Sequence, residues 1–154
     1  MAILYLSLGS NLGDRRKNIE QALTLITERV GGVLALSSQH ETVPWGYKST
    51  RKYLNVAAKV ETTLTPEKVL LATQAIEKAC GRLHKTKEHD YHDRPIDIDI
   101  LLYDNRIIQT PHLTVPHPLM HLRHFVLQPL SEIAPSVKHP TLDQTIATLC
   151  DALQ

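Results

Sequence analysis

Six segments of regular hydrophobic pattern limit the folds that this chain can adopt. Four of them are short, with the apolar and alternating residues typical of strands, and two carry apolar residues at helical spacing. In chain order they predict a strand at 2–8, a helix at about 15–29, strands at 33–40 and 53–63, a helix at about 66–80 and a strand at 96–103. This β-α-β-β-α-β order predicts a ferredoxin-like α+β fold, with two helices on one face of an antiparallel sheet and the other face left for loops and ligand.

The ends of both predicted helices carry typical capping residues. Asp14 can cap the first helix, Thr65 and Pro66 are typical of the start of the second, and Gly81 is typical of its end. After Asp104 the pattern weakens. The remaining expected elements are a short strand near 106–108, proline-rich turns over 111–118, a strand near 125–128 and a last helix at about 142–152.

Length and composition indicate one globular domain spanning residues 1–154. The chain is 42% apolar and 21% charged, which is sufficient for a hydrophobic core. A net charge of +1 gives no strong overall field for nucleic acid or an anionic membrane. Cys80 and Cys150 form no disulfide framework or metal spacing, and the first apolar run, 2–8, resembles neither a membrane span nor a signal peptide. We therefore expect a cytoplasmic protein, a monomer, that binds neither nucleic acid nor membrane.

Two aspartates interrupt the apolar strand at 96–103. Residues two apart on a strand share a face, so Asp97 and Asp99 project together, roughly 7 Å apart, while the isoleucines between them face the core. Two carboxylates with no cysteine nearby suit Mg²⁺, which completes its coordination with phosphate oxygens and water. The alternative is the solvated face of an edge strand, where charges are common.

Other polar residues acquire a role only if the acidic pair binds a ligand. The loop at 82–94 is rich in arginine, lysine and histidine, as a phosphate-binding loop would be, although its acidic residues also fit a solvated loop. Tyr53 and Asn55 share a strand face. Tyr53 could stack on a planar ring, and the Asn55 amide could form hydrogen bonds with the edge of that ring. Two His-x-x-His pairs lack a third zinc ligand, and the glycine turn at 9–14 lacks the Gly-Lys ending of a phosphate-binding P-loop.

Motifs along nearly the whole chain resemble one family. The sequence resembles the 6-hydroxymethyl-7,8-dihydropterin pyrophosphokinases of the folate pathway, and the pairing of the acidic strand with the segment that follows it is the most specific part of the resemblance. The segments that carry it are LGSNLGD (8–14), ETVPWG (41–46), YLNVAA (53–58), QAIEKACGR (74–82), DRPIDIDILLYD (93–104) and LTVPHPLMHLRHFVLQPLSEIAP (113–135).

The resemblance implies a reaction and a set of site residues. Such an enzyme moves the pyrophosphoryl group of ATP onto the pterin hydroxymethyl oxygen and releases AMP, with two Mg²⁺ ions held by Asp97 and Asp99. The implied catalytic residues are Arg82, Arg94, Asp97 and Asp99. The implied pterin-binding residues are Thr42, Val43, Trp45, Tyr53, Asn55 and Phe125. The implied ATP-binding residues are Gln74, Glu77, Arg82, His84, Tyr91, Arg94, Ile100, Thr114, His117 and Arg123.

Three alternatives predict different products or ligands. A kinase that transfers one phosphoryl group would release ADP, and a nucleotide-binding regulatory domain would give no pterin-dependent product. An RNA-binding module of the same fold would use a sheet motif with stacked aromatics, which the sequence lacks, since only 5% of its residues are aromatic.

Overall fold

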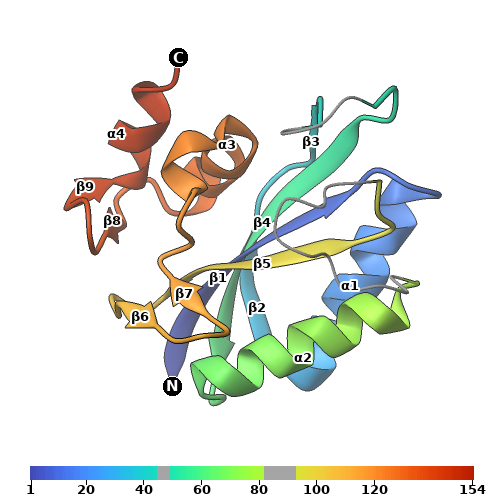
Figure 1. The fold of residues 1–154 in the computed structure, drawn as a ribbon, viewed down its shortest axis with the longest axis horizontal. Coiled ribbons are helices and arrows are strands. Elements are labelled where there is room, and N and C mark those ends of the chain that lie inside the picture. The colour runs from blue at the N-terminus through green and yellow to red at the C-terminus, as the bar shows by residue number, and fades with distance from the viewer. Residues whose placement is uncertain (45–48, 82–92) are drawn as a thin grey trace.

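A twisted antiparallel sheet runs through the centre of the molecule (Figure 1). The computed structural model describes residues 1–44, 49–81 and 93–154. The main strands lie in the order β2-β4-β1-β5, with a short β3 paired to the free end of β4. Their bounds are β1 Ala2–Ser10, β2 Gly31–Leu36, β3 His40–Thr42, β4 Tyr53–Thr62 and β5 Asp97–Tyr103. This strand order confirms the predicted ferredoxin-like fold.

Helices α1 (Arg15–Arg29) and α2 (Pro66–Ala79) cover one face of the sheet, as the sequence predicts. Their buried stripes pack against the side chains of β1, β4 and β5 that point to this face, including Leu4, Leu6, Leu8, Val56, Ala58, Val60, Ile98 and Ile100. The predicted caps are confirmed. Asp14 accepts the backbone N–H of Lys17 at 3.1 Å, Thr65 accepts that of Lys68 at 3.3 Å, and Gly81 follows α2 with φ +101°.

The opposite face is not left to loops alone, because α3 (His124–Ile133) and α4 (Ile146–Asp151) cover part of it (Figure 1). The strand expected near 125–128 is wrong, since these residues begin α3. Val126, Leu127 and Leu130 of α3 are buried at one helical spacing, and they pack with Tyr5 and other residues in a second hydrophobic core. The three-residue apolar run at 125–127 cannot by itself distinguish a strand from a helical stripe.

A bulge in β5 allows the strand to contribute side chains to both hydrophobic cores. The register with β1 shifts so that Tyr5 pairs with Leu102 but Leu6 pairs with Ile100, which leaves Leu101 as the extra residue. Leu101 and Leu102 therefore belong to the second core, whereas Ile100 and Tyr103 belong to the first. The predicted burial of the apolar residues of 96–103 is confirmed, but their simple alternation ends at Ile100.

The strand expected at 33–40 is divided into two. β2 starts earlier, at Gly31, where an added Cβ would lie 2.0 Å from the carbonyl oxygen of Glu61, so close pairing with β4 requires glycine. At Ser37 the chain bonds to Ala57 of β4 through both its backbone N–H and its hydroxyl. After the irregular residues 37–39, β3 pairs with Tyr53–Asn55 of the same strand.

The remaining elements are short. The strand expected near 106–108 lies at β6 (Ile108–Gln109) and pairs with β7 (Thr114–Val115), within the segment expected to be turns. A 3₁₀ helix, η1 (Met120–Leu122), precedes α3, and the hairpin of β8 (Lys138–His139) and β9 (Gln144–Thr145) precedes α4, which is shorter than the predicted helix. Among the described residues, no helix has the length and apolar character needed to cross a membrane.

Candidate functional site

The expected site residues lie on the second sheet face, where β1 ends and β4 and β5 begin. Gly9 pairs with Asn55 on one side and with Asp97 on the other, and Ser7 pairs in the same way with Ala57 and Asp99. Directly opposed residues in a sheet project to the same face. Asn55 and Asp97 therefore lie two strand spacings apart, roughly 10 Å, with only a glycine between them.

Asp97 and Asp99 are both partly buried on this face, while Ile96, Ile98 and Ile100 are buried on the other. The predicted division of the strand is thus confirmed. Loss of hydration, followed by the charge of Asp97, raises the pKa of Asp99 to about 8, although Arg123 and Arg94 oppose the rise. Without a cation, the Asp99 carboxyl is therefore mostly protonated at pH 7, and a bound cation would favour its charged form.

The cationic residues lie around the acidic pair. The guanidinium Nη1 of Arg94 is 3.2 Å from Oδ1 of Asp97, and the Arg94 side chain is only 8% exposed. The backbone of Arg94 is hydrogen-bonded to Asn11, which directly follows β1. Asn11 accepts its backbone N–H at 2.7 Å through Oδ1, and the Asn11 backbone N–H donates to the Arg94 carbonyl oxygen at 3.1 Å. The position of Arg94 is therefore determined by contacts 83 residues away in sequence.

Arg123, Phe125 and His117 close the site from the side of α3. The Arg123 guanidinium carbon lies 5.6 Å from the centre of the Phe125 ring, and Arg123 is buried. Desolvation, with the charge of Arg123 as the next cause, lowers the pKa of His117 to about 4, so its imidazole is neutral at pH 7. Nδ1 of His117 lies 3.2 Å from the backbone nitrogen of Leu119 and accepts its N–H, which leaves the proton on Nε2.

The other end of the site is formed by β3 and β4. Asn55 is buried, and its Nδ2 donates to the Thr42 hydroxyl at 2.6 Å. Tyr53 is half-buried on the same face, with its ring beside Gly9. A buried amide next to a hydroxyl and an aromatic ring is a combination that can bind the edge and the face of a planar heterocycle.

Not every expected residue has a contact that supports its role. Glu77 is buried and accepts the backbone N–H of Ile98 at 2.9 Å, so it joins α2 to the outer edge of β5. The Ile100 side chain points into the first core, and Val43 is 70% exposed. Gln74 is partly buried on α2, and Thr114 is exposed on β7. Trp45, Arg82, His84 and Tyr91 lie outside the described residues.

The site includes two residues that sequence reasoning missed, Gly9 and Asn11. A Cβ at Gly9 would lie 2.9 Å from Oδ1 of Asn55 and 3.2 Å from Cδ1 of Tyr53, so only glycine leaves these side chains where they are. For Asn11 the sequence predicts only a place in the glycine turn at 9–14. The available signal was the run of small and polar residues after an apolar strand, which often marks a close approach of backbone to another group.

The donor set on the acidic face is suitable for a hard divalent cation. Among the described residues, no group of three or more His, Cys, Asp or Glu could hold a metal ion alone. Two carboxylates beside arginines fit Mg²⁺ that shares its coordination with phosphate oxygens, because Mg²⁺ commonly takes one or two protein carboxylates. The residues present therefore fit the ion that the sequence predicts.

Comparisons with known proteins identify the family. Residues 5–135 match the family model for 7,8-dihydro-6-hydroxymethylpterin-pyrophosphokinase (HPPK). A 2-amino-4-hydroxy-6-hydroxymethyldihydropteridine pyrophosphokinase of Porphyromonas gingivalis is 50% identical over 91% of this chain and 95% of its own length. The Bacillus subtilis protein of the same name is 42% identical over 88% of this chain and 80% of its own length.

The structural comparison agrees with the fold. A wild-type Plasmodium falciparum HPPK-DHPS structure with pteroate has a TM-score of 0.80 and 17% identity, over 98% of this chain. The chain spans 44% of the length of that protein, and at this identity the likeness concerns the fold. By fold and site, the chain is a ferredoxin-like α+β protein with acidic and basic residues gathered on its open sheet face. It belongs to the 7,8-dihydro-6-hydroxymethylpterin-pyrophosphokinase family.

Proposed function

We propose that this protein transfers the pyrophosphoryl group of ATP to the hydroxymethyl oxygen of 6-hydroxymethyl-7,8-dihydropterin, with release of AMP, in folate biosynthesis. Family membership supports the reaction. The observation that carries it for this chain is the row Asn55–Gly9–Asp97. An amide that can bind a heterocycle and a carboxylate that can bind a metal lie on one face, separated by bare backbone, so a pterin at one end could extend its hydroxymethyl group toward the other.

The pterin end uses groups that bind without reacting. Asn55, oriented by Thr42, would bind the ring edge, and the rings of Tyr53 and Phe125 would bind its two faces. Val43 and Trp45 remain candidates for contacts through their backbone. These contacts would hold the hydroxymethyl oxygen in line with the β-phosphorus of ATP, which is the main requirement of phosphoryl-type transfer.

The ATP end neutralises charge. Arg94 and Arg123 would bind phosphate oxygens, together with the expected Arg82, and the neutral His117 would donate from Nε2. Gln74, Glu77, His84, Tyr91, Ile100 and Thr114 remain candidates for the nucleotide side. Asp97 and Asp99 would hold Mg²⁺, two ions by our expectation, whose positive charge on the phosphate oxygens favours the attack of the alcohol. The bond from the β-phosphorus to the bridging oxygen of AMP would break as the new ester bond forms, and the hydroxyl proton would pass to water or to one of the two aspartates.

A product assay tests the reaction directly. Purified protein, ATP, Mg²⁺ and 6-hydroxymethyl-7,8-dihydropterin should give AMP, and only when the pterin is present. ADP as the nucleotide product would instead indicate a kinase that transfers one phosphoryl group. Absence of any pterin-dependent product would indicate a binding protein.

The expected monomer, the cytoplasmic location and the extent of the domain over 1–154 remain predictions. Cys80 and Cys150 are buried and unbridged, which is compatible with a reducing compartment. Sedimentation of the purified protein at several concentrations would test the expected oligomeric state.

A further inference from the structure

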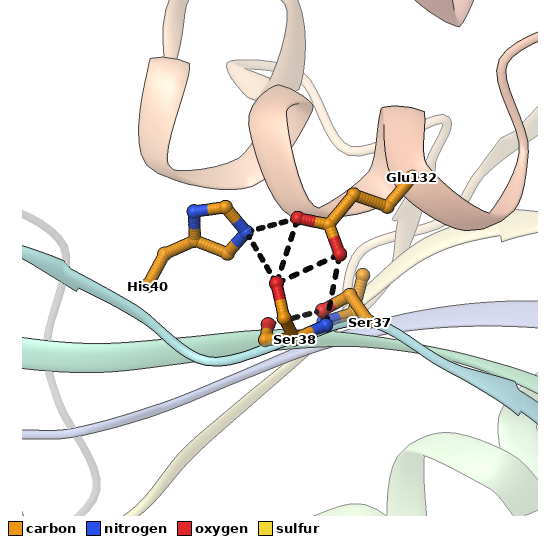
Figure 2. Close-up of polar contacts among 5 residues, drawn as sticks. Ser37, Ser38, His40 and Glu132 are labelled. Carbon is orange, nitrogen blue, oxygen red and sulfur yellow. Dashed lines mark hydrogen bonds and ion pairs between the residues drawn. The ribbon is translucent and has the colours of Figure 1, made fainter.

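A cluster of Ser38, His40 and Glu132 joins the start of β3 and the segment before it to helix α3 (Figure 2). Oε1 of Glu132 accepts the backbone N–H of Ser38 at 2.9 Å, and the Ser38 hydroxyl lies 2.9 Å from each carboxylate oxygen. Nε2 of His40 bonds to Oε2 of Glu132. The backbone N–H of Ser38, together with the other contacts, holds the pKa of Glu132 below its usual value. We call this cluster the 38–132 clamp.

The clamp has the residue types of a hydrolytic triad but not its geometry. The same nitrogen of His40, Nε2, lies 3.3 Å from the Ser38 hydroxyl and also bonds to Glu132. A proton relay needs opposite ring nitrogens, one facing the nucleophile and one facing the carboxylate. The Ser38 hydroxyl is directed to the carboxylate itself, so the contacts indicate a structural link.

The link lies next to the pterin end of the proposed site. In the pairing of β3 with β4, His40 is opposite Asn55, and Thr42 is opposite Tyr53. Thr42 is the residue that accepts from the Asn55 amide at 2.6 Å. Only one residue, Glu41, thus separates the clamp from the Thr42 hydroxyl that orients Asn55.

The two elements that the clamp joins are held very differently by the rest of the protein. α3 is anchored by Val126, Leu127 and Leu130, which are buried in the second core. β3 has only three residues. Among the described residues its strand pairing is to β4, and its Glu41 also forms an exposed ion pair with Arg15 of α1 at 2.9 Å. Loss of the clamp should therefore affect the position of β3 much more than that of α3.

We propose that the 38–132 clamp is a positioning device for pterin binding, in which Glu132 holds β3 against α3 and so keeps Thr42 at the distance that orients Asn55. This inference rests on the proposed function, and it concerns residues that do not touch the substrate. Arg123, a phosphate-binding candidate, is the N-cap of the well-anchored α3, so loss of the clamp should affect the pterin and leave ATP almost unaffected.

The test is Glu132→Ala, with the Kd for 6-hydroxymethyl-7,8-dihydropterin and the KM for ATP measured separately. We expect the pterin Kd to rise about three- to tenfold, where tenfold corresponds to about 1.4 kcal/mol, with the KM for ATP nearly unchanged. Glu132→Gln still offers an oxygen to the Ser38 N–H and should restore most of the affinity. Ser38→Ala should raise the pterin Kd by a smaller factor and serves if Glu132→Ala folds poorly.

The control is Glu20→Ala, an exposed glutamate of α1 on the opposite face of the sheet, which should leave both constants unchanged. An unchanged pterin Kd in both Glu132→Ala and Ser38→Ala, or an equal rise in the KM for ATP, would overturn the proposal. Backbone amide exchange of β3, measured without substrate, should be faster in Glu132→Ala, and unchanged exchange would also overturn it. If the unmodified protein bound no pterin, the proposed function would be overturned instead. The amide exchange rates would still test whether the clamp fixes the position of β3.

Discussion

The side chain of Asn11 holds the backbone of Arg94, accepting its N–H at 2.7 Å inside the protein. Nδ2 of Asn11 also donates to Oδ1 of Asp93 at 2.8 Å and to the carbonyl oxygen of Arg51 at 3.2 Å. One buried amide thus connects the turn after β1 to two other segments of the site. Arg94 contacts Asp97 from this position, so the orientation of a catalytic candidate depends on a residue outside the candidate set.

Replacement of Asn11 by alanine should weaken both the fold and the site. Because buried partners of Asn11 would lose their hydrogen bonds, we expect a loss of about 1–3 kcal/mol in the free energy of unfolding. Turnover should fall more than the folded fraction does, as Arg94 loses its fixed position. Urea unfolding and steady-state assays check the two effects. Asn18→Ala is the matched control, since Asn18 bonds Leu12 and Ser10 but not Arg94; equal turnover in the two variants would contradict the role given to Asn11.

The acidic pair should be required for turnover and not for folding. Asp97→Asn and Asp99→Asn should each lower kcat by about 10²–10³-fold, the range for loss of one group that stabilises developing charge. Without metal, Asp99→Asn should unfold at a higher urea concentration at pH 8 than the unmodified protein, because it removes a poorly hydrated charge beside Asp97. Asp151→Asn, at an exposed position on α4, is the control. Normal turnover in both site variants would refute the metal assignment.

Gly9 should tolerate no side chain. In Gly9→Ala the new methyl group would lie 2.9 Å from Oδ1 of Asn55, so Asn55 and Tyr53 must move and the pterin Kd should rise by about tenfold or more, which is about 1.4 kcal/mol. Gly32→Ala is the matched control, because a Cβ there meets no atom within 4 Å. Isothermal titration with the pterin checks the difference. Equal affinities in the two variants would mean that the pterin does not use this row of the sheet.

His117 should make the protein less stable in mild acid. Its pKa is about 4 in the folded protein and near 6.5 when unfolded, so the unfolded chain binds more protons between these values. The contribution of the neutral imidazole is therefore complete above about pH 6.5 and is lost as the pH falls toward 4. Urea unfolding at pH 5 and pH 7 should show a smaller pH dependence in His117→Asn, whose amide oxygen can still accept the Leu119 N–H. An NMR titration of His117 with a midpoint near 6.5 would contradict this.

Tyr53→Ala should weaken the binding of the pterin but not that of ATP. Because Tyr53 lies beside Gly9 and Asn55 at the pterin end, its loss should raise the pterin Kd and leave the KM for ATP nearly unchanged. Phe125→Ala offers a comparison, since the Phe125 ring also lies near Arg123 and its loss should affect both substrates. A Tyr53→Ala variant that bound the pterin normally would remove Tyr53 from the site.

The sequence by itself determined the order of the main elements and the face on which the acidic pair lies. These features are local, because a period of two or of 3.6 residues, a cap such as Asp14 or Thr65 and an i, i+2 pair of carboxylates depend only on neighbouring residues. The prediction of a strand near 125–128 is wrong because it used only neighbouring residues. Tertiary contacts with Tyr5 and the other residues of the second core select a helix there.

Only the tertiary structure decided which distant residues meet. The register of β1 with β4 and β5 places Gly9 between Asn55 and Asp97, and a single buried amide fixes Arg94. The 38–132 clamp joins residues 94 positions apart in the same way. Such pairings depend on strand register, on the bulge at Leu101 and on the packing of α3, and each of these results from the balance of contacts over the whole chain.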